Sequence, residues 1–258
     1  MTLPPVLRLV VRNFASNFDA ISVAVRFGQP AVTIVVLGTM FSAYISGQVT
    51  GTSSYTAFLV PGMIAFQMVS GGVVSGNLFW LDRRWAMVEQ IFSGPFLRSE
   101  YLAGLVLTTL LFSMLGVGLM ILVAVPLIGL PALSPLALAS VLATVGLGGI
   151  FFAGLLIALG TRLRSANAYF SIQSFLQLFL IFLSTVYYPV RAGKTPWLLA
   201  DVVQANPLSF AADAIRAAFS GTLNGTVALG LGVLGLLAAL SFGAAVWGFR
   251  TMNLGPIQ

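Results

Sequence analysis

Amide and hydroxyl side chains inside otherwise apolar runs are the residues of this 258-residue sequence with the clearest capacity for chemistry. Their spacing of three or four residues places them on one face of a helix in each of two runs. Such a face can hydrogen-bond a solute or a neighbouring helix, and the pattern favours neither. Phe66 and Tyr187 lie nearby in the sequence, Tyr187 also being a candidate interfacial anchor. The two polar faces consist of Gln67, Ser70, Val74 and Asn77, and of Gln173, Gln177, Leu180 and Ser184.

Most other chemistry is excluded by residue type. The sequence has no cysteine and no histidine, which removes thiol nucleophiles, disulfides, His-ligated metals and Ser-His pairs. All acidic residues lie outside the apolar runs or at their edges, namely Asp19, Asp82, Glu89, Glu100, Asp201 and Asp213. A carrier driven by protons or sodium usually keeps an ionisable group near the membrane midplane. We therefore predict no catalytic residue, no metal site and an external source of energy.

One short stretch resembles a phosphate-binding loop but lacks a required residue. Gly193-Lys194-Thr195 resembles the end of that motif, but Tyr188 stands where its first glycine is required. The cradle of backbone N–H groups cannot form without that glycine. We therefore predict that this chain binds no nucleotide or other cofactor itself.

Composition places the chain in a membrane. Hydrophobic residues make up 59% of it and charged residues 7%, far from the values of soluble domains. Backbone groups in lipid must be hydrogen-bonded internally, so long apolar runs predict helices. The net charge of +6 comes from basic residues scattered at the borders of these runs, which argues against a nucleic-acid partner.

Six apolar runs predict six membrane-spanning helices, at about 29–47, 56–80, 101–126, 134–160, 168–189 and 224–249. We therefore predict an all-α, polytopic membrane protein that forms one domain over residues 1–258. If the N-terminus is cytoplasmic, Arg191, Lys194 and Arg216 are the only basic residues outside. The positive-inside rule thus predicts that both termini are cytoplasmic.

Two segments outside these runs have their own character. Residues 1–28 carry Leu7, Val10, Val11, Phe14, Phe18, Ile21 and Val25 at helical spacing, which predicts an amphipathic helix at the inner membrane surface. An ordinary helix packed on a neighbour is the alternative. Residues 191–223 are half apolar and predict two short re-entrant helices, with Asp213 and Arg216 paired on one of them. A plain external loop is the alternative there.

A polar segment at residues 81–100 separates two apolar runs. It alternates charged and bulky apolar side chains and ends its first half at Gly94-Pro95, which predicts a short amphipathic helix followed by a breaker. A solvated loop would not need so many apolar groups. We therefore predict a docking surface for a partner, formed by Arg83, Arg84, Trp85, Val88, Glu89 and Phe92.

Four stretches resemble the type 2 ABC exporter permeases. DRRWAMVEQIFSGPFLRSEYLAGLVL is similar to the cytoplasmic segment of that family, although many relatives carry an acid-rich sequence where this chain has Asp82-Arg83-Arg84-Trp85. The other stretches are GQPAVTIVVLGTMFSAYISG, YTAFLVPGMIAFQMVSGGVVSGNLFW and ANPLSFAADAIRAAF. They occur in the family's order and span nearly the whole chain. The drug, lipid or lipo-oligosaccharide exporters are the most similar branch.

The resemblance implies a prokaryotic plasma-membrane protein that pairs with a second permease copy. It also implies two separate ATP-binding cassette subunits, which carry ATP and Mg²⁺ and dock on the helix at 83–92. The implied substrate is an amphipathic lipid, drug or lipid-linked glycan, moved along a path between spans two and five. Candidate path residues are Phe66, Gln67, Ser70, Asn77, Gln173, Gln177, Ser184 and Tyr187.

Two other classes of function compete with this interpretation. An ATP-independent channel or secondary carrier would transport without a partner, which the absence of ionisable residues inside the spans disfavours. An intramembrane enzyme would need histidine or paired carboxylates at the midplane, and the sequence has neither.

Overall fold

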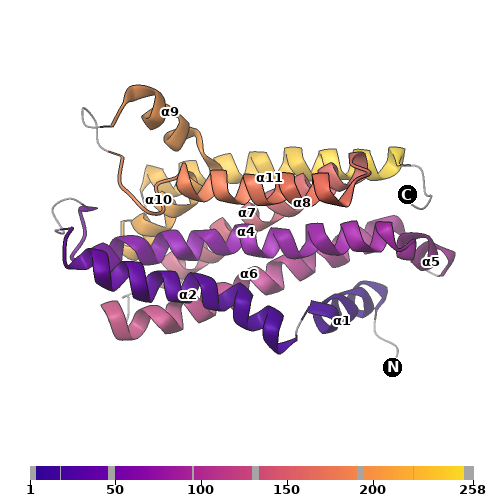
Figure 1. Cartoon of the computed structure of the whole chain (residues 1–258), viewed down its shortest axis with the longest axis horizontal. Coiled ribbons are helices and arrows are strands. Elements are labelled where there is room, and N and C mark those ends of the chain that lie inside the picture. The colour runs from indigo at the N-terminus through magenta and orange to yellow at the C-terminus, as the bar shows by residue number, and fades with distance from the viewer. Residues whose placement is uncertain are drawn as a thin grey trace.

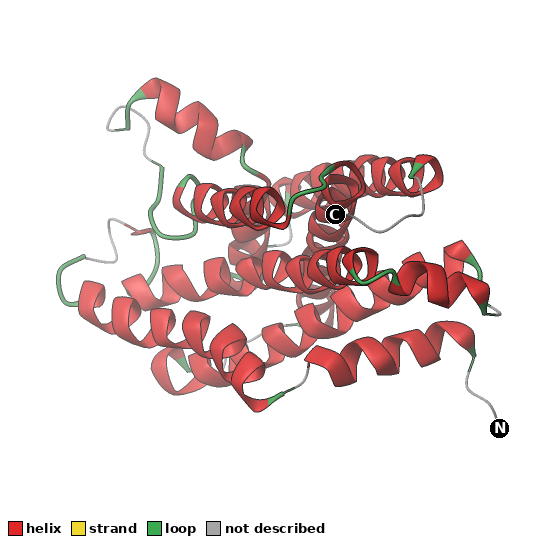
Figure 2. Ribbon diagram, turned by 45° about the vertical axis from the view of Figure 1, so that its right-hand side comes forward, coloured by secondary structure: helices red, strands yellow, loops and turns green. Residues whose placement is uncertain are grey.

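The computed structural model describes residues 4–17, 19–45, 50–94, 96–129, 134–190, 195–222 and 224–252. These residues form a bundle of long helices and contain no strand (Figures 1 and 2). The fold class predicted from the sequence is confirmed. The helices are α1 (Pro5–Asn17), α2 (Ala20–Ser42), α4 (Tyr55–Arg84), α5 (Met87–Ser93), α6 (Arg98–Ile128), α7 (Pro135–Arg162), α8 (Ala166–Phe182), α9 (Trp197–Ala205), α10 (Pro207–Phe219) and α11 (Gly225–Thr251).

The centre of the bundle is α4, which packs against α2, α6, α7 and α10. Small residues permit this close packing. A Cβ atom added to Gly72 would lie 2.8 Å from the backbone nitrogen of Ala153 in α7, and one added to Gly76 would lie 2.5 Å from Leu156 Cβ. The Gly72–Gly76 pair therefore sets how near α4 and α7 can come.

Five helices are long and apolar enough to cross a membrane: α2, α4, α6, α7 and α11. The fifth predicted span, at 168–189, corresponds to the shorter apolar helix α8, which ends at Phe182 and not near residue 189. The reason lies in α10. The side chain of Asn206 donates hydrogen bonds to the carbonyl oxygens of Leu180 and Leu183, and Ser209 Oγ accepts one from the Thr185 backbone. These bonds satisfy the backbone without a further helical turn.

The predicted helix over residues 1–28 is in fact divided. α1 ends at Asn17, and Asp19 begins α2 by accepting hydrogen bonds from the backbone nitrogens of Ile21 and Ser22. These hydrogen bonds, chiefly with Ser22, lower the pKa of Asp19 from its ordinary value. The cap explains why one continuous helix does not form. Ile21 and Val25 therefore belong to the first span, and Phe18 lies outside the described residues.

Within α1, the predicted apolar face is also divided. Leu9 and Val10 are buried and Leu9 packs over Gly104 of α6, whereas Leu7 and Val11 are exposed. One side of α1 thus packs on α6, while another side presents apolar residues outward. This arrangement suits a helix at the membrane surface.

The segment before the last span contains two short helices, α9 and α10, as the re-entrant interpretation predicts. α10 is buried against α4, α7 and α11, with Leu208, Ala211 and Ile215 in the core. Arg191 and Lys194 lie outside the described residues. α1 and the last turns of α11 (Gly225–Thr251) lie at the same end of the bundle as α5, and α9 and α10 lie at the opposite end (Figure 1).

Candidate functional site

The segment at 81–100 forms a tight corner between α4 and α6. α4 ends at Arg84, Ala86 adopts a left-handed backbone conformation with φ of 55°, and α5 follows at once. A left-handed residue other than glycine is uncommon and turns the chain sharply. The corner sets α5 across the end of the bundle (Figure 1).

The six predicted docking residues divide into two sets. Arg84 and Trp85 are exposed, Trp85 by 67%, and Glu89 is half-buried without a hydrogen bond or ion pair in the described part of the chain. Val88 is buried, and Phe92 packs its ring on Tyr101 and Phe249. The outward set can contact a partner. The inward set holds α5 on the bundle.

Arg83 was also expected to face the partner, but in the structure its side chain is engaged by α7. Its guanidinium donates to the carbonyl oxygens of Gly160 and Leu163 at the end of α7. The last carbonyl oxygens of a helix need such donors. Arg83 therefore caps a neighbouring helix.

Behind the corner lies a polar network that the sequence analysis did not find. Asp82 is buried, forms a 2.6 Å ion pair with Arg12 of α1, and accepts a 2.9 Å hydrogen bond from the Tyr101 hydroxyl of α6. Arg12 also donates to Asn13, which in turn donates to Thr108. Three helices are thus joined directly beneath the docking segment.

Part of the predicted substrate path converges in one cavity of about 440 Å³ between α2, α4 and α8. Ser70, Gln173 and Gln177 line it together with Phe66. These are side chains from both polar faces read in the sequence. A cavity of this size that combines apolar side chains with a small number of polar groups is typical of small-molecule sites.

The polar face of α4 has a different register from the predicted one. Phe66, Ser70 and Val73 line the cavity and share a face by their spacing. Gln67 is fully buried on the other side, close to Gly116 of α6, and its amide nitrogen donates to the Met63 carbonyl. Gln67 is therefore a packing residue in this structure.

The remaining predicted path residues lie apart from the cavity lining. Asn77 is half-buried, and its Oδ1 has no hydrogen-bond partner among the described residues. Ser184 is buried in the turn after α8 and donates to the Ile181 carbonyl, so it does not continue the α8 face. The Tyr187 carbonyl accepts a hydrogen bond from the Tyr55 hydroxyl. The Tyr55 hydrogen bond holds the turn after α8 to α4.

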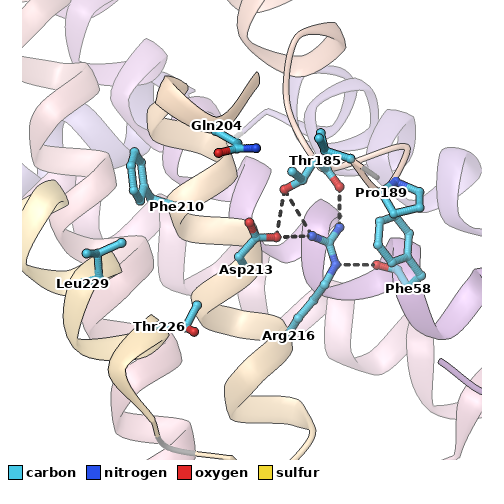
Figure 3. Close-up of a pocket in the computed structure, with 10 residues that line it drawn as sticks. Phe58, Thr185, Pro189, Gln204, Phe210, Asp213, Arg216, Thr226 and Leu229 are labelled. Carbon is cyan, nitrogen blue, oxygen red and sulfur yellow. Dashed lines mark hydrogen bonds and ion pairs between the residues drawn. The ribbon is translucent and has the colours of Figure 1, made fainter. Parts of the chain in front are cut away.

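Arg216 of α10 joins three segments at the other end of the bundle (Figure 3). Its guanidinium donates to Asp213 Oδ1 at 2.7 Å and to the Thr185 carbonyl at 2.6 Å, and it lies 3.9 Å from the ring centroid of Phe58. The predicted Asp213–Arg216 pair is confirmed. These residues border a second cavity of about 520 Å³. The sequence showed the pair but not the turn that it holds.

No cluster of three or more His, Cys, Asp or Glu side chains suited to a metal occurs in the described ranges.

A family model described as the ABC-2 type transporter matches residues 6–220, which extend from α1 through α10. This chain belongs to the ABC-2 type transporter family. A search of curated proteins finds no match. The chain is thus a multi-pass membrane permease of an ABC transporter and is itself not catalytic. Within this ABC-2 permease, the corner at α5 and the cavity between α2, α4 and α8 are the two candidate functional regions.

Proposed function

We propose that this permease is the membrane subunit of an ATP-driven exporter and that α5 is its docking site for an ATP-binding cassette subunit. Two permease copies and two ATPase subunits form the working complex. Both termini and α5 face the cytoplasm of a prokaryotic cell. The substrate is an amphipathic molecule taken from the inner leaflet or the cytoplasm.

The observation that carries the proposal is the division of residues at the corner. Arg84, Trp85 and Glu89 are available on the outside, while Val88 and Phe92 fasten α5 to the bundle. An exposed tryptophan beside an unpaired charge is the composition of an interface hot spot. A firmly held helix transmits a rigid-body movement of its partner to the spans behind it.

The polar network behind α5 connects the docking segment to the spans. The Asp82 carboxylate, in the last turn of α4, contacts both Arg12 and Tyr101. Ser70, which lines the cavity, lies three helical turns earlier on α4, about 18 Å away along the axis. A displacement of the corner therefore moves α4, and with it one wall of the cavity.

Transport in liposomes distinguishes this proposal from the ATP-independent carrier or channel. The purified chain is reconstituted with and without the ATPase subunit, and uptake of a labelled amphiphile into inside-out vesicles is followed. The proposal predicts uptake only with the ATPase and ATP. Equal uptake by the chain alone would establish the carrier or channel instead.

A second experiment tests the docking site within the complex. Replacing Arg84 and Glu89 together with alanine removes two charged side chains from the outward set. We expect transport stimulated by ATP to fall to background while the chain remains folded. D201A, which removes an exposed charge from α9 at the opposite end, is the control and keeps full transport. Unchanged stimulated transport by the double variant would refute the docking role.

A further inference from the structure

Arg26 is the one charged residue of α2, and it lies inside this candidate span. It is about 9 Å along the helix axis from Ala20, at 1.5 Å per residue. From the sequence, Arg26 was expected in the segment before the first span, which was predicted to begin at about residue 29. A charge within a span is costly and commonly marks a site of function.

The surroundings of Arg26 offset its charge only in part, through the Phe112 ring and the nearby charge of Asp19. Its guanidinium carbon lies 5.0 Å from the ring centroid of Phe112, and its NH1 nitrogen is buried with no hydrogen-bond partner in the described ranges. Neither ion pair found among the described residues includes it. Asp19, the acidic residue nearest in the chain, caps α2 through its Oδ1.

Arg26 lines the cavity between α2, α4 and α8, and no acidic residue shares that lining. Ser70 comes from α4, and Gln173 and Gln177 come from α8. Gln173 Oε1 is buried without a partner in the part of the chain described. One cation and several neutral hydrogen-bonding groups therefore converge on a space of about 440 Å³.

We propose that this cavity binds the phosphate-bearing headgroup of an amphipathic substrate, with Arg26 as the ion-pair partner. This inference rests on the proposed transport function and names its substrate class. The planar guanidinium matches phosphate oxygens. The two amides and the Ser70 hydroxyl supply further donors, more than the two oxygens of a carboxylate require.

The apolar part of the substrate has a surface available beside the cavity. Val25 of α2 and Phe175 and Leu178 of α8 are exposed by 66%, 64% and 60%. They lie on the two helices that flank the cavity. An acyl or isoprenoid chain can lie along them while the headgroup occupies the cavity.

Binding to the full chain in dodecyl maltoside micelles, which contain no phosphate, tests the proposal without ATPase or nucleotide. The probes are phosphatidic acid, diacylglycerol with the same acyl chains, and inorganic phosphate. We expect saturable binding of phosphatidic acid, at least tenfold weaker binding of diacylglycerol, and no displacement by micromolar inorganic phosphate. Equal binding of the two lipids would overturn the proposal. Inorganic phosphate that binds as tightly as phosphatidic acid would show a site for the free ion and overturn the lipid assignment.

Binding measurements on variants test whether Arg26 holds the headgroup. We expect R26Q to weaken binding of phosphatidic acid at least tenfold and Q177A several-fold, while R164Q, which changes an exposed arginine between α7 and α8, has no effect. If R26Q does not fold, R26K keeps the charge but loses the planar fork and is expected to bind severalfold more weakly. Wild-type affinity in the folded Arg26 variant would contradict the proposal.

This experiment separates the two proposals. If the chain shows no preference for phosphate but exports with ATP, the proposed function stands and only the substrate class is wrong. A chain that binds phosphatidic acid but never transports with an ATPase retains the site and loses the transport mechanism.

Discussion

Asp82 and Arg12 form a 2.6 Å ion pair between the end of α4 and the surface helix α1, although 70 residues separate them in the chain. The pair lies directly before the exposed residues Arg84 and Trp85. Because the Asp82 side chain is only 7% exposed, whereas that of Arg12 is 31% exposed, Asp82 without Arg12 would be a poorly solvated charge.

A double-mutant cycle measures this connection. R12Q and D82N are each expected to lower the free energy of unfolding in detergent by about 1–2 kcal/mol, and the double variant by clearly less than their sum. The reason is that R12Q, D82N and the double variant all lose the same Arg12–Asp82 ion pair. Thermal unfolding of the four proteins provides the measurement. Strictly additive effects would show that the two side chains do not depend on each other.

Neighbouring arginines at the corner have opposite roles. R83A removes the donor to the carbonyl oxygens of Gly160 and Leu163 and is expected to cost about 1–2 kcal/mol of stability. R84A removes an exposed side chain and is expected to stay within about 0.5 kcal/mol of the wild type. The same thermal assay compares them. A destabilised R84A beside a stable R83A would reverse the assignment.

Close packing of α4 on α7 is tested by comparing two helical glycines in different surroundings, Gly72 and Gly225. G72A places a Cβ atom 2.8 Å from the Ala153 backbone nitrogen and is expected to cost about 1–3 kcal/mol. G225A meets no atom within 4 Å and begins a helix, so stability should be unchanged or slightly higher. Unfolding midpoints in one detergent decide this. Equal midpoints for the two variants would be inconsistent with the described packing.

Arg216 is expected to be irreplaceable by lysine. R216K keeps a positive charge but cannot reach Asp213, the Thr185 carbonyl and the Phe58 carbonyl together. The loss of these bonds at a partly buried position should lower stability by about 2 kcal/mol. R164K, at an exposed position, is the matched control. If R216K unfolds at the wild-type temperature, the guanidinium does not hold the turn after α8.

The sequence predicted the helices well where a single physical effect dominates. Long apolar runs must form helices in lipid, and the segment at 81–100 had to leave the membrane because of its charges. The two short helices before the last span were also predicted from composition. The Asn206 to Pro207 step begins the second of them, as a cap followed by proline usually does.

Predictions failed where contacts between distant segments decide the outcome. α8 ends at Phe182 because Asn206 takes its carbonyl oxygens, and no local signal shows this. Spacing gave the correct period for α4 but not its rotation: of the predicted path residues on α4, Phe66 and Ser70 line the cavity and Gln67 does not. The signal for Arg26 was available: it is an arginine close to the apolar run at 29–47.

The central claim, that an ATPase drives this permease through α5, is tested most directly by ATP-dependent transport in proteoliposomes with two tryptophan variants. Trp85 and Trp197 are exposed by 67% and 75% and lie at opposite ends of the bundle. At limiting ATPase subunit, we predict that W85A lowers transport at least tenfold, because an exposed anchor of the interface is lost, and that W197A leaves it unchanged. Wild-type transport by W85A, or an equal loss in W197A, would contradict the account.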